Sequence, residues 1–354
     1  MKILVIQQKR IGDVLTSTII CNNLKKKYPE SIIDYMCYPN CADVLKENPN
    51  IDNIILLSNK VRKSIPSLFQ FISQIRKKKY DAVIDVYCKL ETNLITLFSG
   101  AKYRVSYHKW YSFLFYNYSY KRFDAIASEH GLAIENRLLL LKPFISDKIT
   151  DVKPKIYLKD SEILEAKEFM KKHSIKGEKP IIMFGILGSE VYKTYPLEKM
   201  AKIIDFTVEK TNADIFFNYM PEQEELALEV YNNCNEKSKK NIHFDLYCTQ
   251  LRPFLALLSQ CDMLIGNEGG AVNMAKAVDI ATFSIFTPSV RKETWQLFEN
   301  EAKHSSIHLK DLKPEIYEQH TEQYIKENTF MYYDEYPLSL ILEKLEDFFE
   351  TYKD

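Results

Sequence analysis

The sequence lacks several features that mark common protein classes. Its 354 residues carry no charge excess, because 48 lysines and arginines balance 48 aspartates and glutamates. A nucleic-acid binder usually shows a basic excess, so composition does not support that class. No apolar run approaches the roughly 20 residues of a membrane-spanning helix. The opening residues MKILVIQ are too short for a signal peptide and are typical of a first strand.

The seven cysteines are few, odd in number and scattered, and no CxxC pair occurs among them. This pattern argues against both a disulfide framework and a structural zinc site. Histidines and cysteines also lack the spacing of a zinc centre, so no metal or other cofactor is expected. Reduced thiols in the cytoplasm are the simplest interpretation.

Strand and helix patterns alternate in two successive halves of the chain. The first half begins with a buried strand at 3–6 and a helix at 14–27, and the second alternation opens at 180–184. Residues 144–160 show little periodicity and mark the boundary. We therefore predict an α/β protein with two Rossmann-like, doubly wound domains, at 1–150 and 151–335, facing a central cleft.

The stretch 261–289 is the clearest single unit. An apolar run at 263–266, a glycine turn, a small-residue helix and a second apolar run at 282–286 form a βαβ pattern. Ligands of such sheets bind beyond the carboxyl ends of the strands. Bare N–H groups at Gly269 and Gly270 favour a diphosphate there, and Asn267 and Glu268 add groups that bind hydroxyls.

Four stretches, taken in order, resemble the ADP-heptose:lipopolysaccharide heptosyltransferases of glycosyltransferase family 9. They are KRIGDVLTSTII (9–20), GAKYRVSY (100–107), GSEVYKTYPLEKMAKII (188–204) and NEGGAVNMAKA (267–277). The resemblance implies a GT-B fold, inverting transfer without a metal, and a nucleotide bound mainly by the C-terminal domain. It also implies that the last helix, within 336–354, packs back on the N-terminal domain.

Asp13 is the predicted catalytic residue. An aspartate near a helix start is often only an N-cap. The resemblance instead matches Asp13 to the family's proposed general base, which takes a proton from the acceptor hydroxyl.

The donor site is predicted on three loops of the second domain. Lys193 matches a family lysine that resembles a phosphate contact, and Gly188 and Ser189 precede it in the same loop. Glu222 and Glu224 follow a strand end, where the family often holds the nucleotide ribose, although a solvated helix face is an equal alternative. The family usually has aspartate where Glu268 stands, so this departure leaves the donor sugar open.

The segment 103–123 is crowded with tyrosine, phenylalanine and basic residues. It is either a packed aromatic face or a contact for the acceptor or a membrane surface. The predicted acceptor-binding residues are Lys9, Arg10, Lys109, Lys121 and Arg122. His130 lies in a stretch that resembles the family but could serve packing.

These observations predict a glycosyltransferase that moves a sugar, heptose by resemblance, from an ADP-sugar to a lipid-linked saccharide such as a lipopolysaccharide core. Peripheral association with the inner face of the cytoplasmic membrane fits that acceptor. Two alternatives stay open at this point: a nucleotide-sugar epimerase or hydrolase of the same fold, and a noncatalytic binder of sugar nucleotides.

Overall fold

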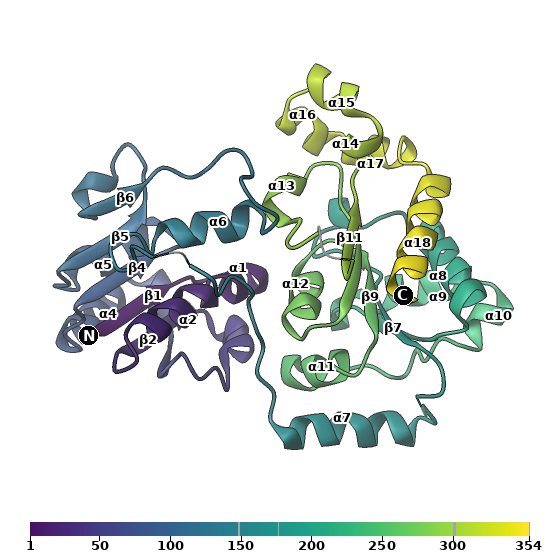
Figure 1. Cartoon of the computed structure of the whole chain (residues 1–354), viewed down its shortest axis with the longest axis horizontal. Coiled ribbons are helices and arrows are strands. Elements are labelled where there is room, and N and C mark those ends of the chain that lie inside the picture. The colour runs from purple at the N-terminus through teal and green to yellow at the C-terminus, as the bar shows by residue number, and fades with distance from the viewer. Residues whose placement is uncertain (148, 176, 300–301, 354) are drawn as a thin grey trace. The chain divides into compact units, whose positions relative to one another are not determined.

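The computed structural model describes residues 1–147, 149–175, 177–299 and 302–353. The chain divides into two compact units, Met1–Tyr157 and Leu158–Asp354, each built on its own parallel sheet (Figure 1). The division falls within the predicted boundary segment 144–160. In the parts of the chain that the structure describes, no helix is long and apolar enough to cross a membrane.

The first unit is a six-stranded parallel sheet in the order β3-β2-β1-β4-β5-β6. On one face, Leu4 and Ile6 of β1 pack against Ile72 and Ile75 of α4 in a fully apolar cluster. The strands are β1 Lys2–Ile6, β2 Ile32–Cys37, β3 Asn53–Leu56, β4 Ala82–Asp85, β5 Tyr103–Tyr107 and β6 Tyr118–Tyr120. The helical segments are α1 Ile11–Thr16, α2 Thr18–Lys27, η1 Pro39–Leu45, α3 Asn59–Lys63, α4 Ile65–Lys77, α5 Leu90–Phe98, η2 Ser112–Leu114 and α6 Leu132–Leu139.

The aromatic segment 103–123 is more regular than its sequence suggested. It supplies β5 and β6, and the turn between them carries η2. The sequence between residues 125 and 141 predicts one helix, and its first part is wrong, because α6 begins only at Leu132. Residues before it form a loop held by Glu135, whose carboxylate accepts hydrogen bonds from the backbone N–H groups of Ala127 and Ser128.

The second unit is a five-stranded parallel sheet in the order β11-β10-β9-β7-β8. Its strands are β7 Ile181–Gly185, β8 Asp214–Asn218, β9 Met263–Asn267, β10 Ala281–Ile285 and β11 His304–Ile307. Its helical segments are α7 Asp160–Lys172, η3 Val191–Lys193, α8 Leu197–Thr211, η4 Pro221–Gln223, α9 Glu224–Asn233, α10 Glu236–Lys239, α11 Leu251–Leu258, α12 Gly270–Ala277, α13 Lys292–Trp295, α14 Leu309–Leu312, α15 Pro314–Gln319, α16 Glu322–Glu327, α17 Thr329–Asp334 and α18 Leu338–Lys353.

The final helix α18 corrects one expectation. Its apolar stripe was predicted to pack on the first domain, but Ile341, Leu345 and Phe348 belong to the core of the second unit. Phe348 lies 5.8 Å, centroid to centroid, from Phe283 of β10. The helix packs on the sheet of its own unit and buries the apolar side chains on the face that carries Phe283.

Candidate active site

Asp13 lies at the carboxyl edge of the first sheet, just beyond β1. It is the third residue of α1, and the N-cap position belongs to Arg10, which makes no side-chain capping bond. The interpretation of Asp13 as an N-cap is therefore wrong. Its carboxylate is available for another task.

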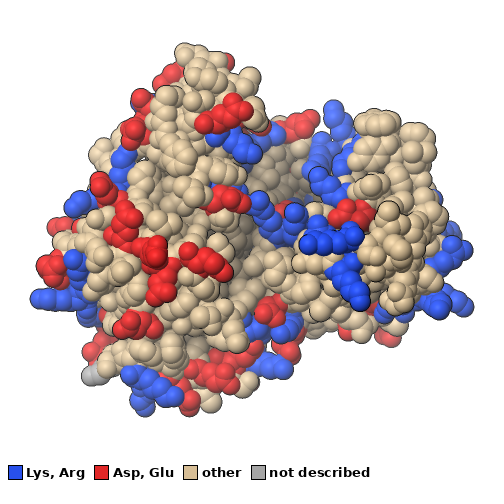
Figure 2. All heavy atoms as spheres, turned by 180° about the vertical axis from the view of Figure 1, so that it is seen from behind, with Lys and Arg blue, Asp and Glu red and all other residues tan. Residues whose placement is uncertain are grey.

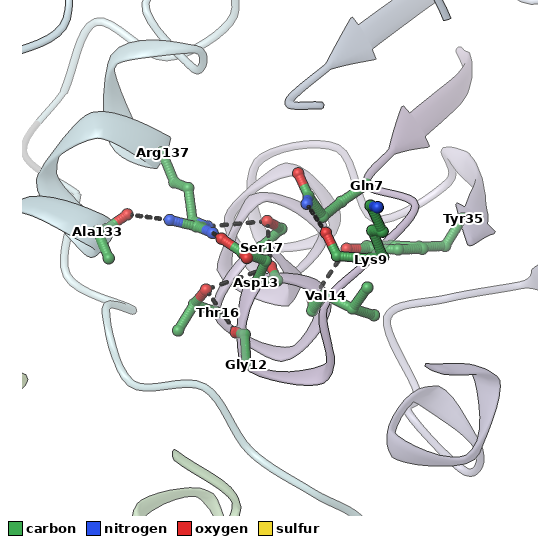
Figure 3. Close-up of polar contacts among 10 residues, drawn as sticks. All are labelled: Gln7, Lys9, Gly12, Asp13, Val14, Thr16, Ser17, Tyr35, Ala133 and Arg137. Atoms are coloured by element: carbon green, nitrogen blue, oxygen red, sulfur yellow. Dashed lines mark hydrogen bonds and ion pairs between the residues drawn. The ribbon is translucent and has the colours of Figure 1, made fainter. Parts of the chain in front are cut away.

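The partner of Asp13 is Arg137, from α6 (Figure 3). The Arg137 guanidinium nitrogen Nη2 lies 2.9 Å from Asp13 Oδ1. The same guanidinium donates to Ser17 Oγ at 2.8 Å and to the Ala133 carbonyl at 2.6 Å. The Arg137 side chain is only 7% exposed, whereas that of Asp13 is 33% exposed. Arg137 thus fixes a carboxylate that solvent, or a substrate hydroxyl, can still reach.

The contact with Arg137 engages only one carboxylate oxygen. Among the residues that the structure describes, no hydrogen bond reaches Asp13 Oδ2. Ser17 Oγ and Arg137 both donate to the backbone carbonyl of Asp13, so the turn itself is held as well. The arrangement leaves one oriented acceptor oxygen, which suits a general base.

The predicted acceptor-binding residues all belong to the first unit. Lys9 and Arg10 are exposed in the loop before Asp13. Lys109 Nζ donates to the carbonyl of Cys88 at 2.5 Å, just beyond β4. The Arg122 guanidinium lies 4.0 Å from the ring centroid of Tyr107, at the end of β5. Parallel strands end at one edge, so these cations lie at the same edge as Asp13.

Three further observations concern the charges of the first unit. Lys121 is exposed beside Arg122. Burial raises the pKa of Tyr107, and the charges of Arg137 and Arg122 oppose that rise. Figure 2 shows several Lys and Arg side chains grouped on the unit seen at the right, beside an area without charged side chains.

The loop after β7 carries the first group of predicted donor residues. Gly188 is required by close approach, because a Cβ there would lie 2.4 Å from the carbonyl oxygen of Lys193. Lys193 is half-buried, and its ammonium lies 5.8 Å from the ring centroid of Tyr192. A second cation, Lys326 of α16, lies 5.8 Å from the same ring. Ser189 is exposed at the tip of the loop.

Asn267 has a role that the sequence did not reveal. It is buried at the end of β9, where its amide oxygen accepts from the N–H of Tyr195 at 2.7 Å. Its amide nitrogen donates to the Gly185 carbonyl, at the end of β7, at 3.0 Å. Asn267 therefore joins two loops of the predicted site, and a direct donor contact by its side chain stays a prediction.

The start of α12 has the open backbone that the glycine turn predicted. Gly269 is the N-cap of this helix and Gly270 its first residue. A Cβ added at either glycine would meet no atom within 4 Å. The glycines are thus not needed for packing, and they leave open space beside the helix start. Glu268 is half-buried beside them, and its backbone N–H donates to the Ile285 carbonyl.

Glu222 and Glu224 are exposed in the segment after β8. The residue between them, which sequence reasoning missed, ties this segment to the β7 loop. Gln223 Nε2 donates to the carbonyl of Gly188 at 2.8 Å. A flat aromatic pair lies nearby, with Tyr219 and Tyr247 stacked at 4.4 Å and 5°.

A cavity of about 590 Å³ lies between α7 and α11 of the second unit. Glu162, Glu165 and Glu168 line it together with Tyr247, and Arg252 of α11 already pairs with Glu162. Three carboxylates disfavour a diphosphate there. The predicted diphosphate position at Gly188 and Gly270 is better placed, at the carboxyl ends of neighbouring strands.

The model of "Glycosyltransferase family 9 (heptosyltransferase)" matches residues 68–325, well over half of the chain. The chain belongs to glycosyltransferase family 9. It is 23% identical over 282 residues to "Lipopolysaccharide heptosyltransferase 3" of Escherichia coli, covering 78% of this chain and 80% of the relative. It is 24% identical over 299 residues to "Lipopolysaccharide heptosyltransferase 1" of Campylobacter coli, covering 82% and 86%.

Solved structures agree with the fold. The structure of "E. coli ADP-heptose lps heptosyltransferase II" superposes with a TM-score of 0.68 at 19% identity, covering 98% of this chain and all of that chain. The chain is therefore a glycosyltransferase of GT-B architecture, which confirms the predicted family and fold class. Within the residues that the structure describes, no cluster of three or more His, Cys, Asp or Glu side chains could hold a metal ion.

Proposed function

We propose that this glycosyltransferase moves a heptose from ADP-heptose to a lipopolysaccharide core or related lipid-linked saccharide, with inversion and without a metal. Relatives named as lipopolysaccharide heptosyltransferases support the sugar and the acceptor class. The observation that carries the mechanism is the Asp13 carboxylate, which Arg137 holds at one oxygen and leaves reachable at the other.

In this proposal, Asp13 takes the proton of the acceptor hydroxyl while that oxygen attacks the anomeric carbon. The bond from this carbon to the diphosphate oxygen breaks, and ADP leaves. A single displacement of this kind inverts the anomeric centre, and one base suffices for it. Lys9, Arg10, Lys109, Lys121 and Arg122 are proposed to attract the anionic groups of the acceptor.

The donor is proposed to bind on the second unit. Lys193 and the open N–H groups at Gly269 and Gly270 stabilise the charge that develops on the departing diphosphate. Ser189 donates to the same oxygens. Glu222 or Glu224 holds the ribose, and Glu268 contacts the sugar.

The test combines binding and turnover. A thermal-shift panel of nucleotide sugars should show the largest rise in melting temperature with ADP-heptose, because a ligand of the folded state stabilises it. With a heptose-deficient core acceptor, the product should gain one heptose of inverted anomeric configuration, and chelators should not change the rate.

Three results would overturn the proposal. ADP release that is equally fast without acceptor identifies a hydrolase. Conversion of the donor into an isomeric nucleotide sugar identifies an epimerase. Binding without turnover, over a broad panel of acceptors, identifies a noncatalytic binder.

A further inference from the structure

The turn between β5 and β6 exposes three large apolar side chains. Trp110 is 84% exposed, Phe113 72% and Leu114 56%. We call these three residues the aromatic tip. Single exposed apolar residues are ordinary, but a cluster within one turn usually marks a contact surface.

The aromatic tip is held in place rather than loosely tethered. The N–H of Ser112 donates to the Lys109 carbonyl at 2.9 Å, and the N–H of Tyr116 donates to the Ser112 carbonyl at 2.9 Å. Arg104 Nε donates to the carbonyl of Phe115 at 2.9 Å. The buried Tyr116 hydroxyl anchors the turn to Asp85 at 2.7 Å. The fold therefore presents the tip outward, although its own core gains nothing from it.

The segment that carries the aromatic tip is basic. Residues 101–123 contain no aspartate or glutamate, but they contain Lys102, Arg104, Lys109, Lys121 and Arg122. The chain as a whole is neutral, so this local excess is a feature of the segment. Exposed apolar side chains within a basic segment are the pattern expected for contact with an anionic lipid surface.

We propose that the aromatic tip inserts into the interfacial layer of an anionic lipid bilayer, with cations of the same segment at the level of the headgroups. Tryptophan favours this layer because its ring is amphipathic. A stable protein interface needs roughly 800 Å² from each partner, more than three side chains on one turn supply. A lipid surface has no such requirement, since insertion of a few rings and nearby charges act together.

Contact between the aromatic tip and a lipid surface would serve the proposed reaction. Lys109, which begins the turn, contacts Cys88 at the same sheet edge that carries Asp13. Docking would bring that edge to the lipid surface. This use depends on the proposed lipid-linked acceptor, but vesicle binding itself does not, so the two can fail separately.

The experiment measures binding of the full chain to vesicles of phosphatidylcholine with about one third phosphatidylglycerol, in a flotation assay. The double variant Trp110→Ser/Phe113→Ser should bind at least about tenfold more weakly. The matched control is Ile65→Ser/Phe69→Ser, which removes two exposed apolar side chains, 74% and 50% exposed, from α4 of the same unit. The control should bind like the wild type.

Charge and depth are tested separately. Each cation near the surface contributes about fivefold to binding, so Lys121→Glu/Arg122→Glu should weaken binding by more than about 25-fold. Binding should also fall as salt rises. The chain has two tryptophans, so Trp295→Phe leaves Trp110 as the single reporter. Its fluorescence should shift to the blue with vesicles and be quenched by lipids brominated near the headgroup.

The tip variants should keep full turnover of a soluble, short-chain acceptor. Vesicle binding that is equal in the tip variants and the control would overturn the proposal, as would unquenched Trp110 fluorescence. Dimerisation in sedimentation that the tip variants abolish would overturn it in favour of a second copy of the chain. Vesicle binding without any heptose transfer would instead leave the docking intact and refute the proposed function.

Discussion

The substitution Asp13→Asn tests the proposed base most directly. Asparagine keeps the size of aspartate and an oxygen that can accept from Arg137, but it cannot take a proton from the acceptor. General-base catalysis typically contributes about 100- to 10,000-fold. We expect the transfer rate to fall by that order, while the dissociation constant of the donor stays unchanged.

The stability change can be worked out from the ion pair. A hydrogen bond to a charged group contributes about 1.5–3 kcal/mol. The Asp13 side chain is one-third exposed and asparagine retains a neutral hydrogen bond, so we expect a loss of about 1 kcal/mol. For a unit of this size that loss lowers the melting temperature by about 2–4 °C. The variant is therefore folded at assay temperature, and its rate can be compared with the wild type.

The assay follows ADP release and heptosylated product, and calorimetry gives the donor affinity. The matched control is Asp147→Asn, because Asp147 is an exposed acid of the same unit that pairs with Lys27 at 2.6 Å. The control should transfer at the wild-type rate. Near-normal transfer by Asp13→Asn would refute the assignment of the base. A large fall in melting temperature without a specific loss of rate would show that the carboxylate serves only to hold Arg137.

Three further predictions concern the second unit. Lys193→Ala should weaken ADP-heptose binding about 10- to 150-fold, whereas the exposed control Lys237→Ala should not; equal affinities in calorimetry would remove Lys193 from the site. Gly270→Ala should leave the melting temperature unchanged, because a Cβ there meets no atom, yet it should weaken donor binding if a diphosphate fills that space; unchanged affinity would show that it does not. Burial lowers the pKa of His308 from 6.5 to about 4, and its Nδ1 accepts from the N–H of Lys310. Between pH 6.5 and pH 4, His308 is protonated in the unfolded chain but neutral in the folded one. The contribution of this residue to the free energy of unfolding is therefore complete above pH 6.5 and falls by roughly 3 kcal/mol as the pH drops to 4. Denaturant unfolding of wild type and His308→Asn at pH 7 and 4.5 should show a shallower pH dependence in the variant, and an equal dependence would contradict the assignment.

Local patterns in the sequence predicted most of the fold. The unit at 261–289 was expected as strand, glycine turn, helix and strand, and the structure has β9, α12 and β10 there. Such apolar runs and helical periods depend on neighbours along the chain, so a sequence reports them directly. The segment 103–123 was not predicted as strands, because its strands β5 (YRVSY) and β6 (YSY) are short and aromatic residues also fill the connection between them. Its aromatic composition concealed their period.

The contacts that shape the site are of another kind. Asp13 and Arg137 lie 124 positions apart, and Asn267 reaches Tyr195 across 72. No periodicity in the sequence links such residues, because they meet only where the loops that follow different strands lie at one edge of the folded sheet. The sequence could place Asp13 at that edge, and the resemblance could suggest a role for it. Only the fold shows that a buried guanidinium holds one of its oxygens.

For the last helix, the apolar pattern of the sequence and the resemblance to the family differ in what they predict. Its apolar stripe correctly predicted a helix with one buried face, since a stripe of that width requires a cover. The stripe contains no information about which surface supplies the cover, and the family's fold suggested the first domain. In the structure, Phe283 and Ile285 of β10 and Ile307 of β11 are apolar residues that α18 covers within the second unit. An amphipathic period predicts how much of a helix surface must be buried. The nearest apolar sheet face in the fold determines which surface buries it.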